Sequence, residues 1–87
     1  MGKTSKIKIK NFINPSLEFN TAASLFFKKI NEMPEKEFII DFTDVIFMSR
    51  SFAQEYCYQK SGSVKNIEEI NMSPDVESVF SIVDKNF

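Results

Sequence analysis

The segment from Phe38 to Glu55 holds the densest group of side chains that could do chemistry in this chain. It begins with an apolar run, passes through a short acidic turn, and continues into a predicted helix with serines at its start. Where a strand leads into the start of a helix, hydroxyl groups and free backbone N–H groups meet at one exposed point. An anion or a partner can be held there. The candidate binding residues are Asp44, Ser49, Arg50, Ser51, Gln54 and Glu55.

Catalytic chemistry finds little support in the composition. The chain has no histidine, the side chain whose ordinary pKa lies near neutral pH. A serine nucleophile would need a lysine or a carboxylate as its base, and no suitable spacing is visible. Zinc ligation lacks histidine and a second cysteine, and two glycines make no phosphate-binding loop. We therefore expect no catalytic residues, no metal and no cofactor.

One alternative interpretation is an enzyme or a nucleotide-binding protein that uses a cluster of acidic residues. Asp41, Asp44 and Glu55 could gather at the end of the strand and hold a magnesium ion through their carboxylates. Acidic side chains at such places more commonly cap turns or face solvent. We therefore favour a protein without a metal site.

Length and charge restrict the class of protein further. A chain of 87 residues has room for one domain, spanning residues 1–87. Its 11 basic and 12 acidic residues nearly cancel, and a net charge of −1 argues against a nucleic-acid partner. The N-terminal lysines alternate with isoleucines, as on the solvent face of a half-buried strand. These lysines are Lys3, Lys6, Lys8 and Lys10.

The single cysteine and the short apolar runs indicate the cellular compartment of the protein. Cys57 has no second cysteine to pair with, so an intramolecular disulfide is excluded, and we expect a buried, inert thiol. No apolar run approaches the roughly 20 residues that span a bilayer. The first residues lack the apolar stretch of a signal peptide. We expect a cytoplasmic protein without a membrane partner.

The N-terminal half predicts a strand and a helix. Residues 6–13 are interpreted as a strand, which ends where Pro15 breaks the pattern. A helix is predicted over residues 21–31, with Asn20 or Thr21 as its N-cap. Its apolar positions repeat at the spacing of one helix face. They are Ala22, Leu25, Phe26 and Ile30, widened by Phe27.

The middle of the chain predicts a strand, a helix and a second strand. Residues 38–42 are apolar apart from Asp41, which is typical of a central strand with helices on both faces. Ser51-Phe52-Ala53-Gln54 matches a capping box and begins a helix that runs to about Lys60. Residues 64–72 predict a weaker strand at the edge of the sheet, because two glutamates interrupt its alternation.

The last helix has the clearest signals. Ser73 is predicted as its N-cap and Pro74 as its first residue. An apolar stripe follows, formed by Val76, Val79, Phe80, Val83 and Phe87. The resulting βαβαβα order predicts a single α/β domain with a small, mainly parallel sheet and packed helices.

Residues 39–55 resemble the small bacterial and archaeal STAS-like family, a domain of unknown function. The resemblance lies in Asp41-Phe42, in Val45, in the serine-rich turn, in Phe52-Ala53 and in Glu55. The segment 70–76 also resembles the final strand-to-helix junction of that family. The resemblance covers about residues 17–84 and implies a STAS-like fold.

More distantly, the chain is similar to the STAS domains of anti-sigma factor antagonists. Their equivalent turn has the sequence Asp-Ser-Ser-Gly, and its second serine is phosphorylated by a partner that is both kinase and anti-sigma factor. That serine falls on Ser51, while the residues before it fall on Ser49 and Arg50 and the glycine falls on Phe52. The similarity implies a protein partner, an ATPase-type kinase or anti-sigma-like factor, and a switch by phosphorylation of Ser51.

Two functions therefore stay open. The first is a non-enzymatic regulatory protein-interaction module, switched by phosphorylation of Ser51 or using that serine only as a helix cap. The second is a structural subunit that forms a homodimer or pairs an edge strand with a partner. The ten phenylalanines favour the second, since a small domain can leave an apolar patch exposed.

Overall fold

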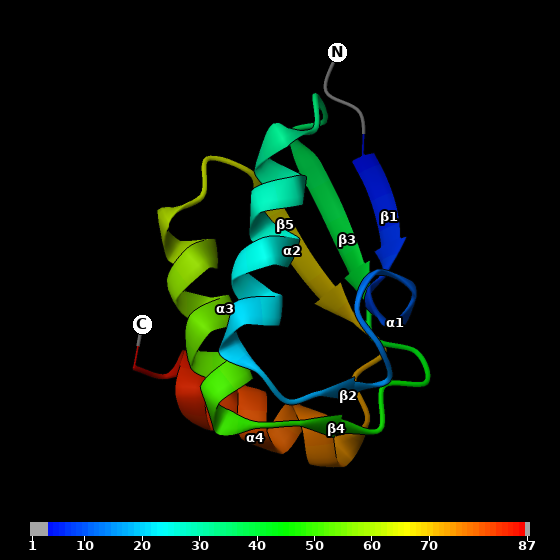
Figure 1. Cartoon of the computed structure of the whole chain (residues 1–87), viewed down its shortest axis with the longest axis vertical. Helices are drawn as coiled ribbons and strands as arrows, with labels where there is room; N and C mark the ends of the chain where they lie inside the picture. The colour runs from blue at the N-terminus through cyan, green and yellow to red at the C-terminus, as the bar shows by residue number, and fades with distance from the viewer. Residues whose placement is uncertain (1–3, 87) are drawn as a thin grey trace.

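Residues 4–86, the part of the chain that the computed structural model describes, form an α/β fold with four helices and two small parallel sheets (Figure 1). Lys3 and Phe87, which the sequence assigns to a lysine strip and an apolar stripe, lie outside the described residues. In chain order the elements are β1 (Thr4–Lys8), α1 (Ile9–Phe12), β2 (Ser16–Leu17), α2 (Asn20–Glu32), β3 (Glu37–Asp41), β4 (Phe47–Met48), α3 (Arg50–Gly62), β5 (Asn66–Ile70) and α4 (Pro74–Asp84).

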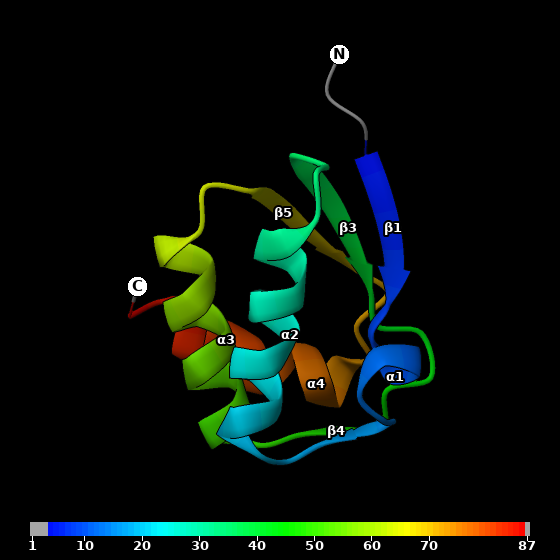
Figure 2. The same ribbon diagram turned by 45° about the horizontal axis from the view of Figure 1, so that its top comes forward.

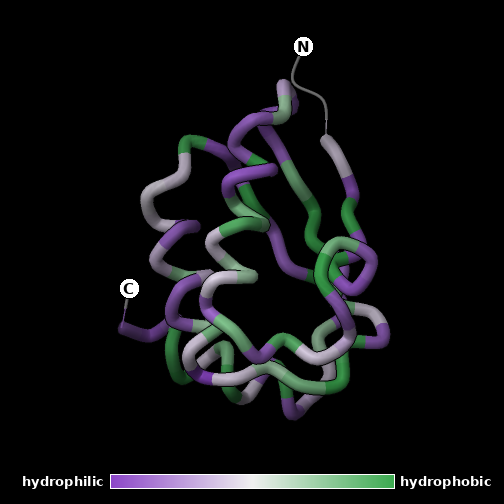
Figure 3. Tube along the Cα trace, viewed as in Figure 1, coloured by the Kyte–Doolittle hydropathy of each residue, from purple (hydrophilic) through white to green (hydrophobic). Residues whose placement is uncertain are grey.

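The main sheet has three parallel strands in the order β1-β3-β5. The predicted α/β class, parallel sheet and βαβαβα order are confirmed, with β3 at the centre and β5 at an edge. In Figure 3 the middle of β3 is hydrophobic, as a central strand requires. The register aligns Lys6, Ile39 and Glu68 in one row across the sheet. A second sheet, β2 with β4, was not predicted, because each strand has only two residues.

Helices cover only one face of the main sheet, so the prediction of helices on both faces is wrong. α2 and α3 lie side by side on the same face (Figures 1 and 2). The physical reason is the strand order: β1, β3 and β5 follow one another in chain order, and successive right-handed crossovers carry their helices to the same side. Phe38 and Ile40 are buried, whereas Glu37 is exposed and Ile39 is half-buried on the other face.

The core lies between the sheet and its helices and is built around one aromatic ring. Tyr56 of α3 is fully buried, and five phenylalanine rings have their centroids 4.9–6.4 Å from its ring. α4 packs against α3 and β4 and closes the core near the ends toward which the strands point (Figure 2). The five rings come from α2, α3, α4 and the residue after β3; they belong to Phe26, Phe27, Phe42, Phe52 and Phe80.

The first predicted strand is too long. β1 ends at Lys8, and residues 9–12 form the single helical turn α1, closed by a 3.0 Å hydrogen bond from the Ile13 N–H to the Ile9 carbonyl. The alternation of lysine and isoleucine predicts only that Ile7 and Ile9 are buried, which they are. It does not distinguish a further strand residue from the start of a helical turn.

The helices α2, α3 and α4 lie where the sequence predicts them, and the apolar face predicted for α2 is confirmed at Phe26, Phe27 and Ile30, which are buried. Leu25, assigned to that face, is instead 59% exposed, and Ala23, not assigned to it, is buried. The N-cap of α2 is Phe19, without a side-chain hydrogen bond, so the predicted cap at Asn20 or Thr21 is wrong. No helix within residues 4–86 is long and apolar enough to cross a membrane.

Candidate functional site

Ser49 caps α3, and the prediction that Ser51 does so is wrong. The Ser49 hydroxyl oxygen accepts a 3.0 Å hydrogen bond from the Phe52 N–H. The same hydroxyl donates a 2.6 Å hydrogen bond to the carbonyl of Glu18, and the Ser49 N–H donates to the carbonyl of Leu17 at 2.8 Å. Ser49 therefore carries a structural function that fixes where α3 begins.

Ser51 is the second residue of α3 and its side chain is exposed. No group within residues 4–86 forms a hydrogen bond with its hydroxyl. A negative charge is well placed there, because the first N–H groups of a helix have no partner inside it and carry a partial positive charge. α4 already has an acid at the same position, Asp75. The Ser51 hydroxyl is thus free for a modification or for a partner.

An open groove lies between α3, along Arg50 to Tyr58, and the end of α4, with the start of α2 beside it. Its volume is about 450 Å³. Four of the six predicted binding residues line it, namely Arg50, Ser51, Gln54 and Glu55. Apolar surface adjoins them: Tyr58 is 63% exposed and Ile82 is 50% exposed. The remaining lining residues are Asn20, Val83 and Asn86.

Two charged side chains line the groove. Arg50 is exposed, is the only arginine of the sequence, and forms no ion pair with any residue of the described range 4–86. Glu55 accepts a 2.7 Å hydrogen bond from the side-chain amide of Gln59. The groove thus combines one free cation, an acid already engaged with an amide, and exposed apolar surface.

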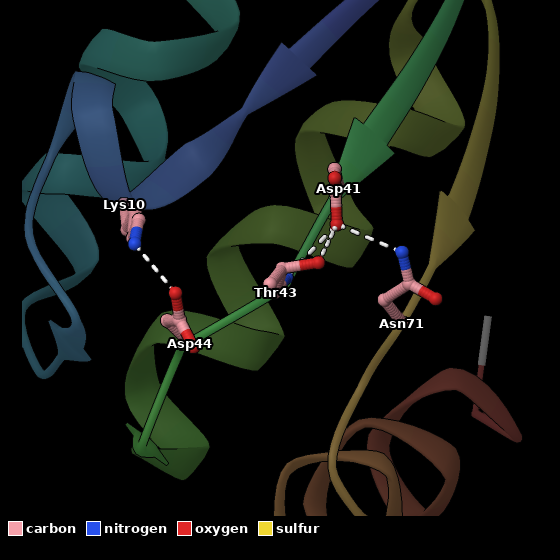
Figure 4. Close-up of polar contacts among 5 residues, drawn as sticks. All are labelled: Lys10, Asp41, Thr43, Asp44 and Asn71. Atoms are coloured by element: carbon pink, nitrogen blue, oxygen red, sulfur yellow. Dashed lines mark hydrogen bonds and ion pairs between the residues drawn. The ribbon is translucent and has the colours of Figure 1, made fainter.

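Asp44 and Ser49, the other two predicted binding residues, do not line the groove. Asp44 lies between β3 and β4 with a φ of 64°, and its carboxylate forms a 2.6 Å ion pair with Lys10 of α1 (Figure 4). The hydrogen bond and charge of Lys10 lower the pKa of Asp44. Asp44 therefore links its turn to α1 through an exposed ion pair.

Asp41 is buried at the end of β3, with 3% of its surface exposed. One carboxylate oxygen accepts hydrogen bonds from the Thr43 hydroxyl at 2.5 Å, from the Thr43 N–H at 2.9 Å and from the side-chain amide of Asn71 at 3.1 Å (Figure 4). The Thr43 hydrogen bonds are the main reason that the pKa of Asp41 is lowered to about 2. Lys6 adds a weaker attraction at 3.9 Å.

The acid cluster considered for magnesium does not form. Asp41 holds its own turn and Asn71, Asp44 pairs with Lys10, and Glu55 lines the groove between α3 and α4. In the described part of the chain, no three acidic, histidine or cysteine side chains come together so that they could hold a metal ion. Asp41, Asp44 and Glu55 therefore do not form the magnesium site that the alternative requires.

The groove joins segments far apart in sequence, and the predicted binding residues supply four of its nine lining residues. The sequence does not indicate that the end of α4 and the start of α2 lie beside α3, so five lining residues were missed: Asn20, Tyr58, Ile82, Val83 and Asn86. One signal was present: Ile82 is a large apolar residue outside the apolar stripe of α4.

Comparison of the chain with models of known families, with curated proteins and with solved structures finds no match.

Proposed function

We propose that this protein is a non-enzymatic, STAS-like regulatory module that binds a protein partner at the groove between α3 and α4, and that phosphorylation of Ser51 weakens this binding. The observation that carries the proposal is the position of Ser51. Its hydroxyl is exposed in an open groove, beside the exposed apolar side chains of Tyr58 and Ile82.

The switch follows from local electrostatics. A phosphate would add about −1.5 to −2 charges at the start of a helix, where N–H groups and the helix dipole tolerate them. The fold would persist, since Ser49 and not Ser51 caps the helix. A partner seated in the groove would instead meet new charge and bulk, which lowers its affinity.

The STAS resemblance supplies the kind of partner that we propose. It is an ATPase-type kinase or an anti-sigma-like factor in the cytoplasm, where an unpaired cysteine such as Cys57 is common. Such a partner would modify Ser51 or be released by its modification. Nucleic acid is a poor alternative partner for a chain with a net charge of −1.

A homodimer or an edge-strand complex is the second candidate. Both outer strands of the main sheet, β1 and β5, have an open edge, and Phe12, Phe19 and Phe47 are exposed. Charged side chains at sheet edges oppose such pairing, and here exposed lysines lie on β1 and the exposed Glu68 lies on β5. We therefore favour the groove. A concentration-dependent increase in mass by analytical ultracentrifugation would instead favour self-association.

The test is a quantitative pull-down from lysate of the native host with wild type, Ser51→Ala and Ser51→Asp. We expect Ser51→Ala to retain a specific partner and Ser51→Asp to lose it, with all three proteins folded by circular dichroism. Thr21→Asp is the matched control: like Ser51, Thr21 is the exposed second residue of a helix, here α2, and it does not line the groove. A partner retained equally by Ser51→Asp would remove the switch.

A further inference from the structure

Arg50 is the chain's one arginine among 11 basic residues, and it lies in the groove rather than in an ion pair of the described range. The described ion pairs of this fold use lysine: Lys6, Lys10 and Lys60. Arginine differs from lysine in that its planar guanidinium forms two parallel hydrogen bonds with a carboxylate. The groove therefore presents a guanidinium group that can bind a carboxylate.

Apolar surface adjoins this cation. Tyr58 is two helical turns beyond Arg50 on α3, and Ile82 faces the same groove from α4. Covering an exposed tyrosine and isoleucine on a groove wall with an apolar side chain removes apolar surface from water and stabilises the complex. Glu55 lies between Arg50 and Tyr58 in sequence, and its negative charge disfavours an acid beside it. A bound carboxylate is therefore directed to the Arg50 end.

We propose that the groove binds a partner segment that presents a carboxylate to Arg50 and, further along the groove, an apolar side chain to Tyr58 and Ile82. The occupant is thus an acidic and apolar segment of another protein, selected by charge complementarity with Arg50. The proposal rests on the proposed function, because it specifies the chemistry of the partner that the same groove would hold.

This assignment also explains how phosphorylation would act. A phosphate on Ser51 would lie beside Arg50 in the sequence, pair with its guanidinium and repel the incoming carboxylate. Phosphorylation would therefore occupy the Arg50 guanidinium as well as obstruct the groove. An acidic partner is released by such a change, whereas a basic partner would be attracted by it.

The experiment selects random peptides displayed on phage against the full chain and against Arg50→Gln. We expect the wild-type pool to be enriched in peptides that carry Asp or Glu within about two to four residues of Leu, Ile or Phe, and Arg50→Gln to lose the acidic preference. A synthetic peptide from the pool should bind wild type about 3- to 10-fold more tightly than its Glu→Gln or Asp→Asn twin. Arg50→Lys should keep part of that ratio. Lys36→Gln, which removes an exposed lysine outside the groove, should keep it fully.

Three results would overturn the proposal: no enrichment over the starting library, a pool without acidic preference, or a preference that survives in Arg50→Gln. The Ser51→Asp variant separates this proposal from the proposed function. If Ser51→Asp loses the lysate partner while the peptides show no acidic preference, the phosphorylation switch is supported and carboxylate binding by Arg50 is rejected. If the peptides require Arg50 but Ser51→Asp keeps the lysate partner, carboxylate binding by Arg50 is supported and the phosphorylation switch is rejected.

Discussion

The hydroxyl of Ser49 donates a 2.6 Å hydrogen bond to the backbone carbonyl of Glu18, thirty-one residues earlier in the chain. The same oxygen accepts the N–H of Phe52 at 3.0 Å. One hydroxyl group therefore caps α3 and ties it to the segment between β2 and α2. Because Ser49 carries both bonds, Ser51 has no part in holding the helix start.

Replacing the two serines separately should give different stabilities. Ser49→Ala removes a cap and a long-range hydrogen bond, so we expect the free energy of unfolding to fall by about 1–2 kcal/mol. Ser51→Ala should change it by less than about 0.5 kcal/mol, as is usual for an exposed residue without a partner. Urea denaturation followed by circular dichroism measures both. An equal loss in the two variants would contradict the assignment of the cap to Ser49.

Asp41 should make stability depend on pH in acid. Its pKa is about 2 in the folded protein, against an ordinary value of 3.8, so folding favours the ionised form. The resulting stabilisation is fully present above the ordinary value and is lost as the pH falls from about 4 toward 2. A pKa difference of this size corresponds to about 2 kcal/mol.

Asp41→Asn tests this contribution directly. At neutral pH the variant should be less stable than wild type by about 2 kcal/mol, and the difference should shrink as the pH falls from about 4 through about 2. Asp44→Asn is the comparison, since Asp44 is exposed and its ion pair with Lys10 is screened by water. A difference between wild type and Asp41→Asn that does not change with pH would show that the carboxylate charge is not the cause.

The parts of the fold that the sequence predicts well are those with local causes. In α4 the Ser73 hydroxyl accepts the Val76 N–H at 3.3 Å and Pro74 is the first helical residue, as predicted. Both signals act within one helical turn, so no knowledge of the rest of the chain is needed. The central place of β3 follows in the same way from its own apolar run.

The parts predicted wrongly depend on contacts between distant residues. Ser49 and Ser51 both precede α3, and the glutamine at position 54 favours Ser51 by the capping-box pattern. The bond from Ser49 to Glu18 and the pairing of β2 with β4 decide for Ser49, and neither is visible in the local sequence. The groove residues Ile82 and Val83 of α4 were hidden for the same reason, since α4 meets α3 only in the folded chain.

Tyr56 should contribute through its ring far more than through its hydroxyl. The hydroxyl donates a 2.9 Å hydrogen bond to Glu69, which also pairs with Lys60 at 2.9 Å. Tyr56→Phe keeps the ring and leaves Glu69 with Lys60, so we expect a loss of about 1 kcal/mol. Tyr56→Ala removes the centre of the aromatic core and should cost about 3–5 kcal/mol. Equal losses in the two variants, measured by urea denaturation, would contradict this division.

The Tyr56 hydroxyl should also resist ionisation. Burial, and next the charge of Glu69, raise the pKa of Tyr56 well above its ordinary value of 10.0. In a Tyr58→Phe variant Tyr56 is the only tyrosine, so near-ultraviolet absorbance reports its ionisation alone. We expect tyrosinate to form only when the chain unfolds in alkali, together with the loss of helical circular dichroism. Ionisation while the chain remains folded would show that the ring is not enclosed.

Cys57 should be inert in the folded protein. Its side chain is 2% exposed, and burial, followed by the charge of Asp84, raises its pKa to about 11 from an ordinary 9.0. Since the thiolate is the reactive form, its fraction at about pH 8 is lowered roughly a hundredfold, and burial slows the reagent further. Ellman's reagent should therefore label wild type at least about a hundredfold more slowly than the urea-unfolded chain. Fast labelling of the native protein would mean that the contact between α3 and α4 opens readily, and the groove would then not be a fixed surface.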